Sequence, residues 1–243
     1  MNLIIDIGNT RSKLAVFEKD IVVGVFVVET SEIVNELKKI ISKYPISQSI
    51  MSTVVNITDN ITKEIVDLVN PLQLTSEVKI PFKNLYATPK TLGVDRIALV
   101  AGAVKNYPNK NVLVIDAGTC ITFDFVNKEK EYLGGAISLG IMMRYKALHE
   151  FTSKLPLLSL KELSSFIGND TNSSIHSGVI NGVCNEIDGV INQYKKKYQD
   201  LTVVLTGGDT IFLAKQLKSI IFANPNFVLE GLHTVLTYNL TND

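Results

Sequence analysis

Apolar and polar residues alternate along the first part of the chain in a pattern that predicts β-strands joined by short polar turns. The apolar run Leu3–Ile5 ends at Asp6, and two further runs rich in β-branched residues follow at Lys13–Phe17 and Ile21–Val28. A charged segment, residues 18–20, separates the last two runs and predicts a hairpin between them. The chain is therefore expected to open with three strands in succession.

A helix, a strand and a second helix are predicted next. Ser31 is placed to cap a helix, because apolar residues recur behind it at helical spacing, namely Ile33, Leu37, Ile40 and Ile41. Residues 49–55 are predicted as a strand and residues 58–69 as a helix with one apolar face. Strands followed by helix, strand and helix indicate an α/β domain.

The same pattern begins again near residue 111. The apolar run Val112–Ile115 ends at Asp116, a β-rich run follows at Ile121–Val126, and another strand is predicted at Tyr132–Ile137. Two such units about 110 residues apart predict a duplicated α/β fold with a cleft between its halves. We therefore expect an N-terminal domain, residues 1–110, packed together with a C-terminal domain, residues 111–243.

Composition places the chain among ordinary globular proteins. Its 243 residues are 46% apolar and 20% charged, and 24 Lys and Arg balance 24 Asp and Glu. Balanced charge gives no electrostatic footprint for nucleic acid or an anionic membrane, and no segment has the roughly 20 apolar residues of a spanning helix. The start of the chain lacks the basic region of a signal peptide. We expect a cytoplasmic protein that binds neither nucleic acid nor membrane.

Neither the cysteines nor the histidines have the spacing of metal ligands. Cys120 and Cys184 form no metal-spaced pair and support no disulfide framework, so we interpret them as small core residues. The histidines are isolated from one another and are interpreted as surface or hydrogen-bonded positions: His149, His176 and His233.

The segment after the first strand carries the first candidate chemistry. Asp6 ends a buried strand, where a carboxylate is costly unless it is paired or binds a cation. Gly8 allows a ligand to approach the backbone closely, and the residues after it supply hydroxyl, amide and positively charged groups. Residues 6–13 together could hold phosphates, with Mg²⁺ near Asp6. The spacing is not that of a P-loop, and the alternative is a plain hairpin turn with an Asx cap.

Two further turns favour the phosphate-binding interpretation. Asp116-Ala117-Gly118-Thr119 repeats the first turn, and the strand Val203–Leu205 leads into Thr206-Gly207-Gly208-Asp209. This set resembles the actin/hexokinase/Hsp70 superfamily, in which two hairpin turns clasp the phosphates and a glycine turn in the second half lies by the adenosine. The resemblance implies an α/β fold of duplicated ribonuclease H-like (actin-like ATPase) domains with an interdomain cleft.

A separate constellation stands at Gly93–Arg96. Gly93 permits a tight entry into a predicted helix whose first turn contains Asp95 and Arg96. An Asp there has an ordinary structural role, because it complements the helix dipole. An arginine at a helix N-terminus is unfavourable to the same dipole, which suggests that an anion holds it. A carboxylate beside such a guanidinium suits a substrate that carries both a hydroxyl and an acid group.

Five motifs sharpen the resemblance to one family, the type III pantothenate kinases. They follow the order and spacing of that family: Asp6-Ile7-Gly8-Asn9-Thr10, Gly93-Val94-Asp95-Arg96, Asp116-Ala117-Gly118-Thr119, Tyr132-Leu133-Gly134-Gly135-Ala136-Ile137 and Ile167-Gly168-Asn169-Asp170-Thr171. Leu155-Pro156 and Glu230-Gly231-Leu232 also resemble it. The resemblance implies ATP-dependent phosphorylation of pantothenate to 4'-phosphopantothenate, the first step of coenzyme A biosynthesis, by a homodimer with ATP and Mg²⁺.

The resemblance also implies roles for individual residues. Asp95 is implied as the general base and Asp116 as the ligand of a monovalent cation, K⁺ or NH₄⁺, while Asp6 is a candidate Mg²⁺ ligand. The implied ATP contacts are Asp6, Ile7, Gly8, Asn9, Thr10, Arg11, Ser12, Lys13 and Thr119. The implied pantothenate contacts are Tyr86, Gly93, Val94, Asp95, Arg96 and Thr171. Tyr86 taken alone is an ordinary loop aromatic.

One departure and two alternatives remain. Where the family usually has a stretch like Ala-Pro-Gly, this chain has Ser138-Leu139-Gly140, which lacks the stiffening proline ring. The first alternative is another kinase or phosphatase of the superfamily, which the compact chain and Gly93–Arg96 disfavour. The second is a non-enzymatic regulator on the same fold, since the family has homologues described as accessory transcription factors. No helix-turn-helix pattern or basic face is visible, and all three aspartates are present, which disfavours a regulator.

Overall fold

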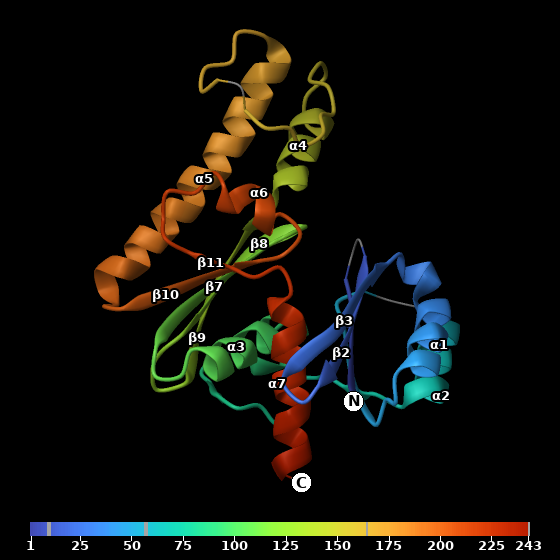
Figure 1. The fold of residues 1–243 in the computed structure, drawn as a ribbon. Helices are drawn as coiled ribbons and strands as arrows, with labels where there is room; N and C mark the ends of the chain where they lie inside the picture. Colours follow the sequence, from blue (N-terminus) through green and yellow to red (C-terminus); the bar gives the residue numbers. More distant parts are fainter. Residues whose placement is uncertain (9–10, 56–57, 164, 243) are drawn as a thin grey trace. The chain divides into compact units, whose positions relative to one another are not determined.

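The computed structural model describes residues 1–8, 11–55, 58–163 and 165–242, and it is a mixed α/β structure (Figure 1). The helices are α1 (Ile33–Lys43), α2 (Asp59–Val69), α3 (Val94–Asn106), α4 (Ile141–Glu150), α5 (Thr171–Lys197), α6 (Thr210–Ala214) and α7 (Phe227–Asn242). The strands are β1 (Asn2–Ile7), β2 (Ser12–Glu18), β3 (Ile21–Val28), β4 (Gln48–Thr53), β5 (Leu72–Gln73), β6 (Lys83–Asn84), β7 (Asn111–Ala117), β8 (Cys120–Val126), β9 (Glu131–Leu139), β10 (Leu201–Thr206) and β11 (Phe222–Ala223). Short 3₁₀ helices occur at Thr30–Glu32 and Pro89–Thr91.

The elements gather into two compact units. The first comprises Met1–Asn109, Glu129–Leu133 and Asn226–Asp243, and the second comprises Lys110–Lys128 and Gly134–Pro225. The first unit thus includes the C-terminal helix α7 as well as the N-terminal strands. The predicted domains, residues 1–110 and 111–243, would instead place α7 with the second half of the chain, and those limits stay a prediction.

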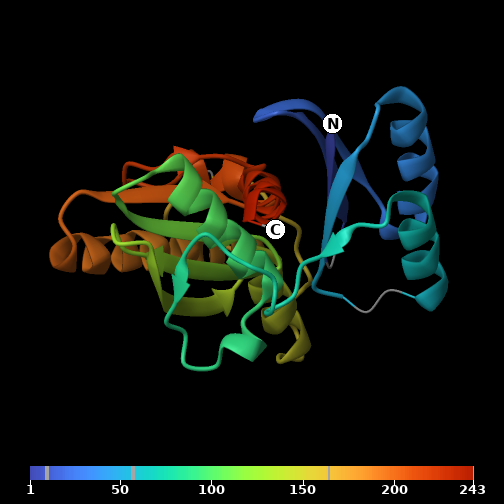
Figure 2. The same ribbon diagram turned by 90° about the horizontal axis from the view of Figure 1, so that it is seen from below.

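The first unit is built on a sheet of strand order β3-β2-β1-β4-β5. β1 pairs with β2 in antiparallel and with β4 in parallel orientation. Alternate residues of β1, namely Leu3, Ile5 and Ile7, share one core cluster with residues of α1 and α2. Helix α7 packs on β1, β2 and β4 (Figure 2). Its residue His233 contacts Asn2 and Phe17, so α7 lies on the face of the sheet opposite to α1 and α2. The carboxylate of Asp6 follows the same alternation and lies on the α7 side of the sheet.

Helices α3 and α7 pack against each other more closely than side chains normally allow (Figure 1). A Cβ atom added to Gly231 would stand 1.9 Å from the carbonyl oxygen of Ala98, and one added to Gly102 would stand 3.2 Å from the Cα of Gly231. Both contacts are with backbone atoms, which cannot move aside without moving a helix. The absence of side chains at these two positions therefore sets the distance between the helices.

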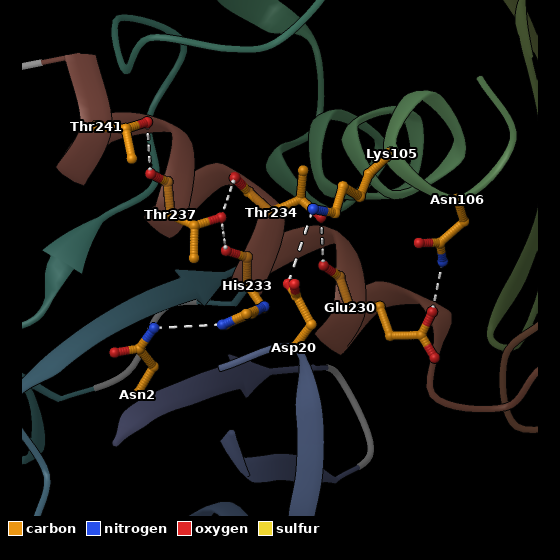
Figure 3. A network of polar contacts seen from close by, with 9 residues as sticks. All are labelled: Asn2, Asp20, Lys105, Asn106, Glu230, His233, Thr234, Thr237 and Thr241. Atoms are coloured by element: carbon orange, nitrogen blue, oxygen red, sulfur yellow. Dashed lines mark hydrogen bonds and ion pairs between the residues drawn. The ribbon is translucent and has the colours of Figure 1, made fainter. Parts of the chain in front are cut away.

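A polar network ties α7 to the sheet and to α3 (Figure 3). The amide of Asn2 donates to Nε2 of His233 at 3.2 Å, and the imidazole stacks on Phe17 with ring centroids 4.2 Å apart. The amide of Asn106 at the end of α3 donates to Glu230 of α7 at 2.7 Å. These contacts hold the C-terminal helix on the face of β1 that carries Asp6.

The second unit is built on a sheet of strand order β11-β10-β7-β8-β9, and β6 pairs with the first residues of β9. β7 pairs with β8 in antiparallel and with β10 in parallel orientation. Leu113, Ile115 and Ala117 of β7 belong to a core cluster with residues of α4, α5 and α6. Helix α5 supplies the largest helical share of that cluster: Ile175, Val179, Ile180, Val183, Ile187 and Ile191.

The structure confirms the predicted strands and helices of both patterns, with one correction at a helix start. Ser31 does not cap the first helix, because residues 30–32 form a 3₁₀ turn and Glu32 precedes α1 without a side-chain capping bond. The prediction took the hydroxyl for a cap, but the tighter turn moves the N-cap one residue along the chain, from Ser31 to Glu32. None of the helices in the described segments is long and apolar enough to cross a membrane.

Candidate active site

Asp6 stands at the end of β1 and is held by the neighbouring strand. The hydroxyl of Ser52 on β4, the strand partner of Asp6, donates to Oδ1 at 2.8 Å. Burial raises the pKa of Asp6, the hydrogen bond from Ser52 and the charge of Lys13 lower it, and the charge of Asp95 raises it again. The balance leaves the pKa above its ordinary value, so the ionised carboxylate gains from any cation placed beside it.

The rest of the first turn is divided between core and surface. The N–H of Gly8 donates to the carbonyl of Arg11 at 3.3 Å and closes the turn, whose residues Asn9 and Thr10 lie outside the described residues. Ile7 is fully buried in the core, so its backbone alone is available to a ligand. Ser12 is also buried, and its hydroxyl is engaged with Thr30 at 3.0 Å.

The two basic residues of this segment differ in their surroundings. Arg11 is exposed and lies 3.5 Å from Glu29. Lys13 is paired across the strands with Asp6 and is close enough for its charge to act on that carboxylate. Lys13 is therefore the better placed of the two to act on whatever Asp6 binds.

Asp95 occupies the first turn of α3, after the N-cap residue Gly93 and the first helical residue Val94. Its Oδ1 accepts the backbone N–H of Arg96 at 2.8 Å. The side chain is partly exposed, and its charge acts on Asp6. The structure thus brings together, within the first unit, two carboxylates that are 89 positions apart in the sequence.

Arg96 and Tyr86 form a stack that the sequence did not show. The guanidinium of Arg96 is 5% exposed and lies over the ring of Tyr86, 5.6 Å from its centroid. Tyr86 in turn stacks on the buried ring of Tyr132, with centroids 6.0 Å apart. A cation on an aromatic face is stabilised when it is removed from water, so this stack accommodates the buried charge. It also fixes Arg96 beside Asp95.

The second turn joins β7 and β8 in the second unit. Asp116 stands near the end of β7, and the N–H of Gly118 donates to the carbonyl of Cys120 at 2.9 Å. Thr119 is exposed, and its carbonyl accepts the N–H of Gly140 at 3.2 Å. Residues 138–140, which lack the proline usual in the family, therefore keep a backbone hydrogen bond to the turn at residues 116–119.

The third turn lies directly against the second. Thr206 ends β10 and is the parallel partner of Asp116. Gly207 has a φ of +96°, and the N–H of Asp209 donates to the carbonyl of Ala117 at 2.9 Å. Burial raises the pKa of Asp209 above its ordinary value. Asp116 and Thr206 are therefore register partners at the ends of two adjacent strands, and the turn that carries Asp209 is bonded through its backbone to the end of β7.

Thr171 is the first residue of α5 in the second unit, where it is exposed. The helix begins with a capping box, in which Asp170 accepts the N–H of Ser173 at 3.0 Å and the hydroxyl of Ser173 is bonded back to Asp170. Such a cap fixes the first turn of the helix and therefore the position of Thr171.

Two residues of these sites have positions that the sequence analysis did not predict. Ser52 lies inside a predicted strand, and only the register of β4 against β1 shows that it faces Asp6. Thr206 was noticed as part of a glycine turn, but its register against Asp116 and the burial of its hydroxyl are visible only in the structure. Ser52 is one of several polar residues in β4, so no pattern in the sequence distinguished it.

Comparison with solved structures defines the class of protein. A protein from Campylobacter jejuni assigned to the Baf family of transcriptional activators has a TM-score of 0.61 at 20% identity, covering 98% of this chain and 99% of that one. A glucokinase from an Antarctic psychrotroph has a TM-score of 0.52 at 12% identity, covering 98% of each chain. At these identities the likeness shows the fold alone, which is that of the actin-like ATPases and sugar kinases.

Sequence comparison is more specific. A model of the family "Type III pantothenate kinase" matches residues 2–193. A type III pantothenate kinase of Flavobacterium johnsoniae is 47% identical over 244 residues, which is 100% of this chain and 100% of that protein. The chain belongs to the type III pantothenate kinase family.

Proposed function

We propose that this chain phosphorylates pantothenate with ATP and so carries out the first step of coenzyme A biosynthesis. Membership of the family supports the overall reaction. The observation that supports the site is that the first unit contains two carboxylates whose charges interact, Asp6 and Asp95, with the buried Arg96 next to the second. Phosphoryl transfer needs a metal-side carboxylate, a residue that orients the attacking hydroxyl, and positive charge.

The proposed step is a direct in-line transfer. The primary hydroxyl of pantothenate attacks the γ-phosphorus, the bond from that phosphorus to the β–γ bridging oxygen breaks, and ADP leaves. Asp95 orients the hydroxyl and accepts its proton, which it can do with little base strength because the transition state is loose. Arg96, fixed on Tyr86, pairs with the pantothenate carboxylate, and Gly93, Val94 and Thr171 complete the contacts to that substrate.

ATP is proposed to contact residues 6–13 and Thr119. Asp6 suits a Mg²⁺ ligand, because burial disfavours its ionised form in the absence of a cation. A Mg²⁺ ion held there by Asp6 would supply positive charge against the phosphates of ATP. The backbone N–H groups of the first turn and Lys13 stabilise charge on the transferred group, whereas the Ser12 hydroxyl is already engaged with Thr30.

We further propose that Asp116 holds a monovalent cation, K⁺ or NH₄⁺, that the chain works as a homodimer, and that it acts in the cytoplasm. A single carboxylate at the end of a strand suits a singly charged ion. An ion held by Asp116 would order the turn that contains Thr119 and would take no part in bond breaking.

A coupled assay for ADP release tests the function directly. With pantothenate as acceptor, ADP should form in proportion to a phosphorylated product, and hexoses should not substitute. ADP release that depends on a sugar instead would assign the chain to another kinase of the same fold. Absence of turnover with any acceptor, in a folded protein that still binds ATP, would favour a regulator.

A further inference from the structure

A row of polar side chains crosses one face of the sheet in the second unit. Asp116 on β7 is flanked by Thr206 on β10 and Thr122 on β8, its register partners in the two adjacent ladders. Ile115, Ala117 and Leu205, which adjoin Asp116 and Thr206 along the strands, belong to the apolar core. Because side chains alternate between the two faces of a sheet, Asp116 and Thr206 point to the opposite face. The carboxylate and the two hydroxyls therefore share the face opposite that core.

The hydroxyl of Thr206 is the unusual member of this row. Thr206 is 1% exposed, and its Oγ1 has no hydrogen-bond partner among the described residues. Thr122 differs, because its hydroxyl donates to Oδ2 of Asp124 at 3.0 Å. A buried hydroxyl left unpaired in a native structure calls for an explanation, and a bound ion is one of the recognised ones.

The backbone places Thr206 next to Asp116 on the adjacent strand, and the following residue, Gly207, lies against the carboxylate of Asp116. A Cβ atom added to Gly207 would stand 2.4 Å from Oδ1 of Asp116 and 2.3 Å from the carbonyl oxygen of Ala117. The bond from the N–H of Asp209 to the same carbonyl, at 2.9 Å, holds the turn in this place. Only glycine fits at position 207, which also has a positive φ.

The two proposed ligand groups, the carboxylate of Asp116 and the hydroxyl of Thr206, carry one negative charge between them. The described part of the chain contains no group of three or more His, Cys, Asp or Glu residues able to hold a metal ion. Divalent ions such as Ca²⁺ are bound by several oxygen ligands that usually include more than one carboxylate. One carboxylate with a neutral hydroxyl instead balances a single positive charge, and a hydroxyl oxygen has lone pairs to offer.

We propose that Oγ1 of Thr206 is a second ligand of the monovalent cation assigned to Asp116. The inference rests on the proposed function of Asp116 and extends it to a residue for which neither the sequence nor the family resemblance implied a role in cation binding. Because a hydroxyl is a neutral ligand, Thr206 raises the affinity of the site for K⁺ without adding charge to it.

Thermal unfolding in different salts tests this without relying on catalysis. The unfolding midpoint of the full chain is measured against KCl concentration, with tetramethylammonium chloride replacing it at constant ionic strength. An ion that binds only the folded state raises the midpoint by mass action. Thr206→Val removes the hydroxyl and keeps the shape, Thr206→Ser keeps the hydroxyl, and Asp116→Asn is the reference for a site without its carboxylate.

Thr202→Val is the matched control, because Thr202 lies on the same strand and the same face as Thr206 but pairs with Val112. We expect Thr206→Val to need about tenfold more K⁺ for half of the effect, while Thr206→Ser and Thr202→Val follow the wild type. The K⁺ concentration for half-maximal activation of ADP release should move in parallel.

The possible results distinguish a failure of the Thr206 ligand from a failure of the cation site at Asp116. If Thr206→Val responds to K⁺ like the wild type while Asp116→Asn does not, Asp116 keeps its role and Thr206 is not a ligand. If Thr206→Val and Thr202→Val shift equally, the effect is a general loosening of β10, and a change confined to the KM for ATP would assign Thr206 to the nucleotide. A wild type indifferent to K⁺ would overturn the cation site itself, and the role of Thr206 with it.

Discussion

Ser52 donates its hydroxyl to Oδ1 of Asp6 at 2.8 Å across the parallel pair of β1 and β4. This bond supports the ionised form of a carboxylate that burial and the charge of Asp95 both disfavour. The strand end is therefore strained electrostatically in the absence of ligand, and a bound cation relieves the strain.

The first prediction concerns Asp6→Asn. Because the pKa of Asp6 is raised in the folded protein, folding favours the protonated form, and the ionised form lowers stability at any pH above that pKa. The variant should therefore lose phosphoryl transfer but unfold at a higher temperature than the wild type at pH 7 without nucleotide or metal. The difference should disappear as the pH falls below the ordinary value for Asp, where both states are protonated.

Ser52→Ala is the converse control for this prediction. Removing a hydrogen bond to a charged group should destabilise the ligand-free protein at pH 7 by about 1.5–3 kcal/mol. Calorimetry or denaturant titration of both variants measures the two effects. If Asp6→Asn proves less stable than the wild type at pH 7, the carboxylate has a structural partner and is not poised for a cation.

The second prediction concerns Asp95→Asn. The amide keeps an oxygen able to accept the N–H of Arg96, so the start of α3 should be preserved. Loss of a positioned base should lower kcat by about 10²–10⁴-fold, with a much smaller change in the KM for pantothenate. Steady-state kinetics with pantothenate as the varied substrate measures both.

Asp59→Asn is the matched control, because Asp59 occupies the first turn of α2 with no assigned substrate. Both substitutions remove a carboxylate that favours the helix dipole, at about 0.3–1 kcal/mol. The control should keep its full kcat. An Asp95→Asn enzyme that retains more than about a third of the wild-type kcat would leave Asp95 with the dipole role alone.

The sequence predicted the strands that end at Asp6 and Asp116, because each is a short run of apolar residues followed by a polar turn. It did not predict α7, since that helix is buried along most of its length, from Phe227 to Leu236, and shows no single apolar face. The strands β5, β6 and β11 have two residues each, which is too short for any periodic signal. Tertiary packing, not local pattern, determines these elements.

The candidate site was predictable to the same extent. Asp6 and Asp95 stand at element ends, where a carboxylate is conspicuous in the sequence. Tyr86 lies in a loop and stacks between Tyr132 and Arg96, an arrangement that depends on the pairing of β6 with β9 and that the sequence does not show. Strand register places Ser52 beside Asp6 and Thr206 beside Asp116, and a single sequence does not reveal register.

The third prediction concerns His233 and the pH dependence of folding. Burial lowers the pKa of His233, the charge of Asp20 raises it and that of Lys105 lowers it (Figure 3). The neutral ring accepts the amide of Asn2 at Nε2 and so carries its proton at Nδ1. Because the unfolded chain binds the proton more tightly, stability should fall as the pH drops below about 6.5.

His233→Phe should flatten this pH dependence, because phenylalanine keeps the stacking on Phe17 but does not titrate. Urea denaturation at several pH values between 5 and 7.5 gives the slope for each protein. The control is His149→Gln, at an exposed side chain. An unchanged slope in His233→Phe would show that another group governs stability in this range.

The last prediction concerns two glycines in helices. Alanine stabilises an exposed helix position by about 0.5–1 kcal/mol relative to glycine, and Gly189 of α5 has nothing within 4 Å of an added Cβ. Gly189→Ala should therefore raise the free energy of unfolding by that amount. Gly231→Ala should do the reverse, by about 3 kcal/mol or more, because the new methyl group would meet the carbonyl of Ala98 at 1.9 Å and force α7 away from α3.

The displacement in Gly231→Ala should also reach the site, since Asp95 and Arg96 stand at the start of α3. We therefore expect a lower kcat in the fraction that remains folded, while Gly189→Ala keeps the wild-type kcat. Denaturant titration and steady-state kinetics on the same preparations compare the two. If both alanines changed stability by the same amount and sign, helix propensity would account for the result, and the close packing of α3 on α7 would not restrict position 231.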